Sequence, residues 1–171
     1  MSQAVIGIVP DFVAADQLVR DLTSSGFANS EISILAPDSP GSRLAYEKHS
    51  KAPEGTATGA AAGGVLGGTI GLLAGIGAIA IPGVGPFIAA GPIMALLSGA
   101  AIGSTVGGVS GGLIGLGIPE IEAKQYEGSL VDGNVLVSVH AEDKELADRA
   151  KEIFKADGAR DVNCIGEKKC D

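Results

Sequence analysis

Two short apolar runs, one near each end of the chain, have the pattern of buried strands. They are Val5–Val9 and Val135–Val139. Each is followed by an aspartate suited to cap a helix, by apolar residues at helical spacing and by a glycine suited to end that helix. A second apolar run follows each predicted helix, at Ile32–Leu35 and at Val162–Ile165. The pattern therefore predicts a strand, a helix and a strand in each half of the molecule.

Two such βαβ units on one sheet make a ferredoxin-like α+β sandwich with right-handed crossovers. In that fold the first and third strands are central, and the second and fourth strands, which here carry Ser33 and Asn163, lie at the edges. Helices cover one face of the sheet. The other face would expose side chains such as Ile6, Ile8 and Leu136, or the alternate set of strand residues. An open apolar face usually has a partner, so we expect dimerisation or docking there.

Charged residues are absent from one long internal stretch. Residues 55–119 contain no Asp, Glu, Lys or Arg and hold 20 of the 27 glycines. Four basic and seven acidic residues precede this stretch, and eight basic and thirteen acidic residues follow it. A soluble domain keeps a wet face on most of its helices. We therefore divide the chain into a folded domain, made of residues 1–54 and 120–171, and an insertion, residues 55–119, between the second and third strands.

The insertion has the lengths expected of a Gly/Ala-rich helical hairpin. An insertion in a turn must leave and return at nearly the same point, which two antiparallel helices of matched length do. Helices over residues 59–81 and 93–118 would be roughly 35–39 Å long, enough to cross a hydrocarbon layer of about 30 Å. A helix-breaking sequence separates them. The residues expected to form the hairpin turn are Pro82, Gly83, Gly85 and Pro86.

Glycines recur at every fourth residue in both predicted helices. Glycine lets two helix backbones approach closely, so such a row predicts a glycine zipper. The row drifts about 40° around the helix at each step, and a single neighbour cannot follow it. We therefore expect contacts with several neighbours in a homo-oligomer. The glycines predicted to pack helix against helix are Gly59, Gly63, Gly67, Gly71, Gly75, Gly99, Gly103, Gly107, Gly111 and Gly115.

Three interpretations of the hairpin stay open. The first is insertion in a membrane, and Arg43, Lys48 and Lys51 would then keep the folded domain on the cytoplasmic side. The second is a soluble oligomer or filament whose hairpins share an apolar core, which fits the weak hydrophobicity of the helices and the few aromatic residues. The third is a small pore. The polar residues that could line such a pore are Thr69, Ser98, Ser104, Thr105 and Ser110.

No pattern in the chain indicates catalysis, so we expect a non-enzymatic protein without a cofactor or a metal. Gly108–Gly112 matches the string G-x-S-x-G but lacks the strand-to-helix turn and the histidine partner of a nucleophile elbow. His140 with Glu142 and Asp143 could touch a metal, but a solvated strand end explains them better. The net charge of −8 argues against nucleic acid as a partner.

Other polar residues have simple explanations. Cys164 and Cys170 are too far apart for a C-x-x-C redox motif, and we expect reduced thiols in the cytosol. A short helix that starts after Pro119 would present its charges on a solvated face. Those charged residues are Glu120, Glu122, Lys124 and Glu127.

Several blocks of sequence carry a resemblance to a known family. They are residues 58–83, the stretch VGPFIAAGPIM at residues 84–94, and the short segments Gly117–Glu120 and Leu136–His140. On these blocks the chain resembles the bacterial general stress protein 17M-like family. The resemblance implies a ferredoxin-like domain interrupted by a glycine-zipper hairpin, in a bacterial stress context and without established catalytic residues. We expect a self-associating, membrane-supporting protein at the bacterial cytoplasmic membrane, or, as the alternative, in the cytoplasm.

Overall fold

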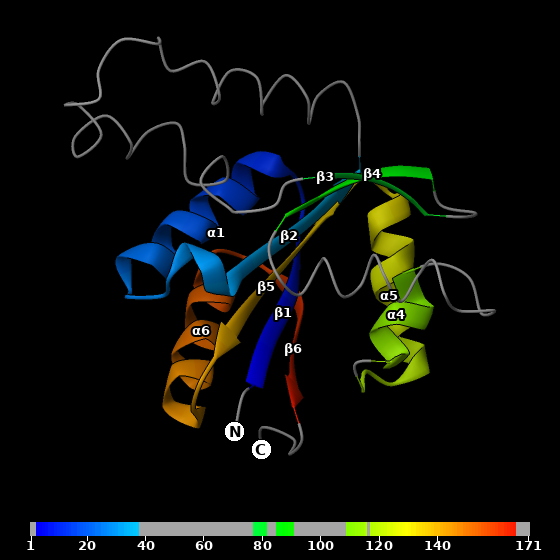
Figure 1. The fold of residues 1–171 in the computed structure, drawn as a ribbon. Helices are drawn as coiled ribbons and strands as arrows, with labels where there is room; N and C mark the ends of the chain where they lie inside the picture. The colour runs from blue at the N-terminus through cyan, green and yellow to red at the C-terminus, as the bar shows by residue number, and fades with distance from the viewer. Residues whose placement is uncertain (1–2, 38–76, 82–84, 91–108, 116, 167–171) are drawn as a thin grey trace, which may run out of the picture.

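The computed structural model describes residues 3–37, 77–81, 85–90, 109–115 and 117–166. These residues form a mixed α+β structure, as predicted (Figure 1). The elements are β1 (Gln3–Val9), α1 (Phe12–Ser24), the 3-10 helix η1 (Asn29–Glu31), β2 (Ile32–Pro37), β3 (Gly77–Ile81), β4 (Gly85–Ala90), α4 (Val109–Gly115), α5 (Glu120–Val131), β5 (Val135–Ala141), α6 (Lys144–Ala156) and β6 (Arg160–Gly166).

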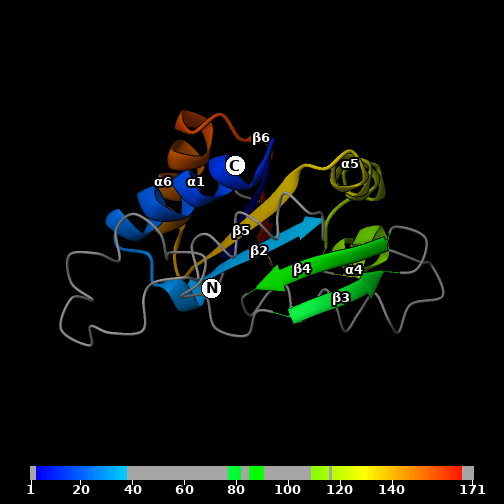
Figure 2. The same cartoon turned by 90° about the horizontal axis from the view of Figure 1, so that it is seen from above.

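The described strands form one antiparallel sheet in the order β3-β4-β2-β5-β1-β6 (Figure 2). The prediction that β1 and β5 lie inside the sheet is confirmed, and β6 lies at an edge as expected. The expectation that β2 is the other edge is wrong. β4 pairs with the outer side of β2, from Ile34 opposite Ala90 to Pro37 opposite Phe87. β2 is therefore an interior strand, and its Ser33 is fully buried.

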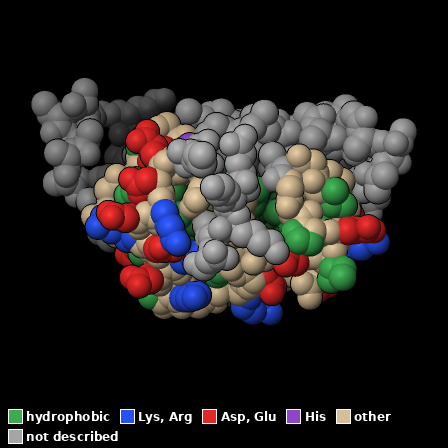
Figure 3. All heavy atoms as spheres, turned by 90° about the horizontal axis from the view of Figure 1, so that it is seen from below, with side chains coloured by type: hydrophobic (Ala, Val, Ile, Leu, Met, Phe, Trp, Pro, Cys, Tyr) green, Lys and Arg blue, Asp and Glu red, His purple; other side chains and the backbone are tan. Residues whose placement is uncertain are grey.

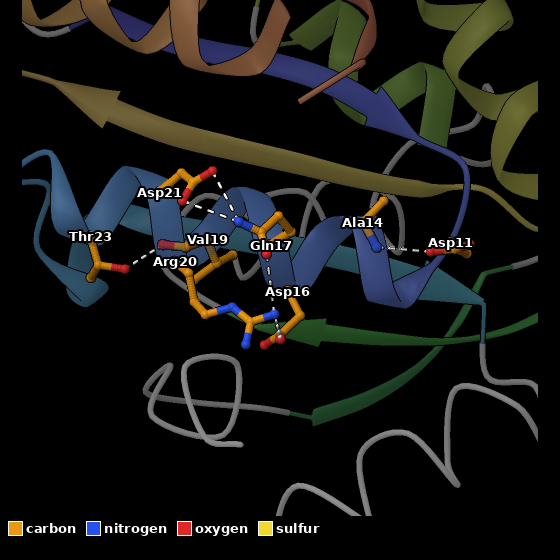
Figure 4. Close-up of polar contacts among 8 residues, drawn as sticks. All are labelled: Asp11, Ala14, Asp16, Gln17, Val19, Arg20, Asp21 and Thr23. Atoms are coloured by element: carbon orange, nitrogen blue, oxygen red, sulfur yellow. Dashed lines mark hydrogen bonds and ion pairs between the residues drawn. The ribbon is translucent and has the colours of Figure 1, made fainter. Parts of the chain in front are cut away.

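Helices α1 and α6 cover one face of the sheet (Figure 1). Asp11 accepts a hydrogen bond of 2.8 Å from the backbone N–H of Ala14, as Figure 4 shows. Asp143 accepts an equal bond of 2.8 Å from Leu146, so both predicted caps form. The apolar stripes of the two helices pack on alternate residues of the strands beneath them. Their buried members are Ala15, Leu18, Val19, Leu22, Ala147, Ala150 and Phe154.

Helices α4 and α5 cover the opposite face of the sheet (Figure 1). Ile6, Ile8 and Leu136, which were expected on an open face, are fully buried there. The expectation of an exposed apolar face is therefore wrong, because helices from the same chain bury it. The members of this second core that come from α4, α5 and the loop between them are Val109, Leu113, Ile118, Ala123, Tyr126 and Leu130.

Part of the predicted helical hairpin is a pair of strands. The helix expected over residues 59–81 is wrong in its last five residues, which form β3 and pair with β4. The register places Ile81 opposite Gly85, so the chain reverses between two strands rather than two helices. Gly85 and Pro86, expected in the turn, begin β4. Strand pairing gives the backbone groups of β4 partners along β2 and those of β3 partners along β4. In a helix, each glycine would cost about 1 kcal/mol relative to alanine.

The remaining hairpin predictions concern few described residues. Gly111 and Gly115 lie in α4, and the helix expected to reach residue 118 ends at Gly115. The division of the chain at residues 54/55 and 119/120 stays a prediction. Within the described ranges, every helix is too short or too polar to cross a membrane. The predicted packing and turn residues outside these ranges are Gly59, Gly63, Gly67, Gly71, Gly75, Pro82, Gly83, Gly99, Gly103 and Gly107.

Gly7 allows α6 to lie close against β1. A β-carbon at Gly7 would lie 2.7 Å from Cδ1 and 3.2 Å from Cε1 of Phe154, and 3.4 Å from Cγ2 of Val162. The Phe154 ring is fully buried and cannot move aside without disturbing the core. A side chain at Gly7 would therefore separate the helix from the strand.

We expect Gly7→Ala to lower the free energy of unfolding by about 1–3 kcal/mol, the usual penalty for overpacking a core. Chemical denaturation of the purified protein measures this change. Gly128→Ala in α5 is the matched control, because its β-carbon would meet nothing within 4 Å. The control should leave stability unchanged or raise it, since alanine is the better helix former. Equal stability of the two variants would contradict the close packing of Phe154 on β1.

Candidate functional site

A polar cluster joins α5 to the edge strand β6. The Tyr126 hydroxyl donates a hydrogen bond to the backbone carbonyl of Asp161. The Asn163 amide donates one bond of 2.9 Å to the same hydroxyl and another of 3.0 Å to Oε2 of Glu122. We call these four residues the α5 anchor. The anchor satisfies both hydrogen-bonding functions of a tyrosine whose side chain is 1% exposed.

A β-bulge in β6 positions the anchor. Ile6 of β1 lies opposite Asn163, but Ile8 lies opposite Arg160, so β6 contains one residue more than β1 over this stretch. Asp161 lies in the bulge and has a φ of 52°. This is a left-handed conformation that is uncommon for a non-glycine residue. Such a conformation persists only where its surroundings hold it. The bond from Tyr126 to the Asp161 carbonyl is one contact that does so.

A second contact connects α4 to α5. Oε2 of Glu127 accepts a hydrogen bond of 3.0 Å from the backbone N–H of Ser110 in α4. A hydrogen bond to an ionised acceptor is stronger than one between neutral groups. The α5 anchor and this contact together fix α4 and α5 on the sheet.

These contacts correct the interpretation of α5 as a helix with a solvated charged face. Glu122 and Glu127 are half-buried and accept hydrogen bonds from Asn163 and Ser110. Only the pair of Glu120 and Lys124, 2.6 Å apart, lies on the exposed face as expected. The sequence signal for the other face is the spacing of Ala123, Tyr126 and Leu130, which places all three against the sheet.

Burial is the main cause that raises the pKa of Tyr126 to about 12; the Asn163 hydrogen bond lowers this pKa, and the neighbouring charges of Asp161 and Glu122 raise it. The hydroxyl is therefore protonated throughout the physiological pH range and remains a donor to the Asp161 carbonyl. A phenol with this pKa is a poor general base near neutral pH. The cluster is suited to hold a helix rather than to move a proton.

The other candidate chemical groups have structural positions. Asp143 caps α6, so this carboxylate is engaged by the backbone of its own helix. Across the described ranges, no group of three His, Cys, Asp or Glu residues could hold a metal ion. Ser110 lies buried in α4, where Glu127 contacts its backbone N–H. Cys164 lies half-buried in β6 and packs against the core under α1 and α6, and Cys170 is outside the described residues.

Two carboxyl groups meet where α1 and α6 end. Asp157 is the C-cap residue of α6, and Asp21 lies in the last turn of α1, where it accepts hydrogen bonds from the Gln17 amide (Figure 4). Oδ2 of Asp157 is buried. Burial, followed by the charge of Asp21 and a hydrogen bond with it, raises the pKa of Asp157 above its ordinary value of 3.8. Ionised Asp157 also faces the negative end of the α6 dipole.

No known protein family, no curated protein and no solved structure matches the chain. The resemblance to the general stress protein 17M-like family therefore stays a prediction. Function has to be inferred from the residues of the chain itself.

We expect Tyr126→Phe to destabilise the protein by about 1–3 kcal/mol, because it leaves the Asp161 carbonyl and the Asn163 amide without their shared partner. Chemical denaturation measures the loss, and hydrogen exchange should show faster opening of α5 than of α6. Lys124→Gln on the same helix is the control, since it removes only the exposed pair with Glu120. If the Tyr126→Phe variant is as stable as the parent and its α5 amides are equally protected, the α5 anchor does not hold the helix.

We expect Asp157→Asn to raise the melting temperature at neutral pH. Because folding raises the pKa of Asp157, the parent loses stability as the pH rises through 3.8 toward the folded pKa. The gain should therefore be largest above that range and vanish below pH 3.8, where the carboxyl is protonated in both states. Asp132→Asn, at the exposed C-cap of α5, is the control for the helix dipole. A gain that is equal in the two variants or independent of pH would contradict the pairing with Asp21.

Proposed function

We propose that this protein is a non-enzymatic, self-associating structural protein whose uncharged, glycine-rich segment binds or enters a membrane. The folded part would lie on the cytoplasmic side and includes β3, β4 and α4 from the uncharged stretch. The other residues of 55–119 would make the contacts with lipid and with other copies. The strand order β2-β5-β1-β6 and the helices after β1 and β5 support a ferredoxin-like arrangement inside the larger sheet. A role in a bacterial stress response rests on the sequence resemblance alone.

One observation carries the proposal. Both faces of the strands β2, β5, β1 and β6 are covered by helices of the same chain, while the longest apolar stretch of the sequence has no charge to favour its exposure to water. Burial of apolar surface contributes about 25 cal/mol per Å², so a long uncharged stretch gains by contact with lipid or with other copies. The associating part is therefore the uncharged stretch rather than an open sheet face.

The way the stretch is held supports a structural role. The uncharged residues follow β2, contribute β3 and β4 to the sheet, and return through α4 to the second core. The α5 anchor and the Glu127 contact use the buried polar side chains of this region to fix helices. The uncharged segment is fixed to the domain near both of its ends. The domain is therefore suited to carry this segment as an appendage.

A soluble assembly with a shared apolar core is the second candidate, and the strands β3 and β4 favour it. β3 leaves residues 59–76 for the first predicted helix. A helix of this length would reach about 27 Å, short of the roughly 30 Å of a hydrocarbon layer. Shorter helices suit a protein core or a shallow membrane contact better than a full crossing.

Membrane fractionation distinguishes the two candidates. We expect the protein to sediment with membranes and to resist a carbonate wash, because its contact with lipid is apolar rather than electrostatic. Recovery as a carbonate-soluble assembly of many copies would support the shared core instead. Recovery as a soluble monomer at every protein concentration would contradict both candidates.

Substitution of the predicted zipper tests the self-association itself. Gly67→Leu and Gly107→Leu should separate helices that touch through glycine, while raising helix propensity and hydrophobicity. We therefore expect smaller assemblies in mild detergent with membrane binding retained. Val65→Ile is the control, since it keeps an aliphatic side chain and leaves the glycines in place. Assemblies of parental size in both glycine variants would show that these glycines are not packing surfaces.

A further inference from the structure

β3 ends the sheet on the side away from β6, in the part of the chain that the structure describes. Its inner side pairs with β4, from Gly77 opposite Ala89 to Ile81 opposite Gly85 (Figure 2). In an antiparallel strand, every second residue directs its backbone N–H and C=O groups away from the paired neighbour. An edge strand therefore presents a row of backbone groups that another strand can complete.

The two edges of the sheet differ in the features that prevent such pairing. β6 begins with Arg160 and Asp161, contains the bulge, and holds Asp161 at a φ of 52°. Charges and bulges are the usual protection of a sheet edge. β3 reads Gly-Ala-Ile-Ala-Ile, without charge or proline, and the nearest charged residues in the sequence are Glu54 and Glu120. The sequence of β3 therefore lacks the residues that keep edges apart.

We propose that the outer edge of β3 pairs with β3 of a second copy of this chain, antiparallel and around a twofold axis. This inference rests on the proposed self-association and names one contact through which it occurs. Pairing centred on Ile79 places Gly77 opposite Ile81 and Ala78 opposite Ala80. A strand edge is complementary to itself in this arrangement, since each copy supplies donors to the acceptors of the other. The two sheets then continue across the axis.

Charge favours a second copy as the partner. Each copy carries a net charge of −8, so two copies repel one another unless they meet where charge is absent. Acidic and basic side chains are spread over the described surface, as Figure 3 shows for one face. β3 and its neighbour β4 both come from the uncharged stretch. Pairing through β3 therefore adds strand hydrogen bonds between copies without bringing like charges into the contact.

A cysteine scan of β3 tests the pairing. Single cysteines are placed at each position from Gly77 to Ile81, in a background with Cys164→Ala and Cys170→Ser, and the protein is oxidised mildly. Opposite β-carbons in an antiparallel pair lie about 4.5–5.5 Å apart, close to the range of a disulfide. Because only the residue on the axis faces its own copy, dimer yield should peak at Ile79→Cys. Val13→Cys, 71% exposed on α1, is the control and should give at least about tenfold less dimer.

The outcomes separate this inference from the proposed function. A peak at any one residue of β3 supports the pairing and locates its axis. Assemblies seen by light scattering, with a flat and low yield along β3, would overturn the pairing and leave self-association through other residues. A monomer at every concentration would overturn both.

A charge on the edge gives an independent measurement with the cysteines left in place. Ala78→Lys should weaken dimerisation by about tenfold or more, because lysine is a residue that native sheets use to block an edge. Val13→Lys changes the net charge equally on α1 and should leave the dissociation constant unchanged. Unchanged far-ultraviolet circular dichroism in both variants shows that the fold is retained. Equal dissociation constants for the two variants would contradict the pairing.

Discussion

Burial of the second face of the sheet is the constraint on which the rest of this structure depends. Ile6, Ile8 and Leu136 form an apolar surface that the first helix pair cannot reach, because α1 and α6 lie on the other side. The chain covers it with α4 and α5. The α5 anchor fixes that cover through a buried tyrosine and a bulged edge strand. Strands that are covered on both faces by their own chain, as β2, β5, β1 and β6 are, do not offer those faces to a partner.

The return of the uncharged stretch follows from the same constraint. Val109 and Leu113 of α4 belong to the second core, so the end of the stretch contributes to folding. Earlier in the stretch, β4 pairs with the outer side of β2 and carries β3 beyond it. β3, β4 and α4 are thus the described parts of the stretch that join it to the domain. The proposed contacts with lipid or with another copy would involve its other apolar residues.

Local patterns in the sequence predicted those parts of the fold that local physics determines. Apolar runs gave β1 and β5, and the caps Asp11 and Asp143 gave the starts of α1 and α6. The apolar face of β1 and β5 was predicted, but what covers it depends on α4, which is distant in sequence and has no charge to mark a wet side. Within residues 77–90, runs of Gly, Ala and Ile fit a helix and a strand equally well. The strand form of these residues depends on pairing with the outer side of β2, which is distant in the sequence.

The candidate site was harder to predict than the fold, because each of its members has an ordinary local explanation. Tyr126 fits a helix stripe, Asn163 fits an edge strand, and Glu122 fits a solvated face. Only the bulge at Asp161 brings them together, and no local pattern predicts a left-handed aspartate.

Hydrogen exchange at several protein concentrations is the most direct test that the chain covers its own sheet. We expect amides of β1, β5 and α5 to be strongly protected, and their protection to be the same in dilute and concentrated samples. Protection of α5 or β1 that falls on dilution would contradict the account, because it would mean that another copy covers the second face.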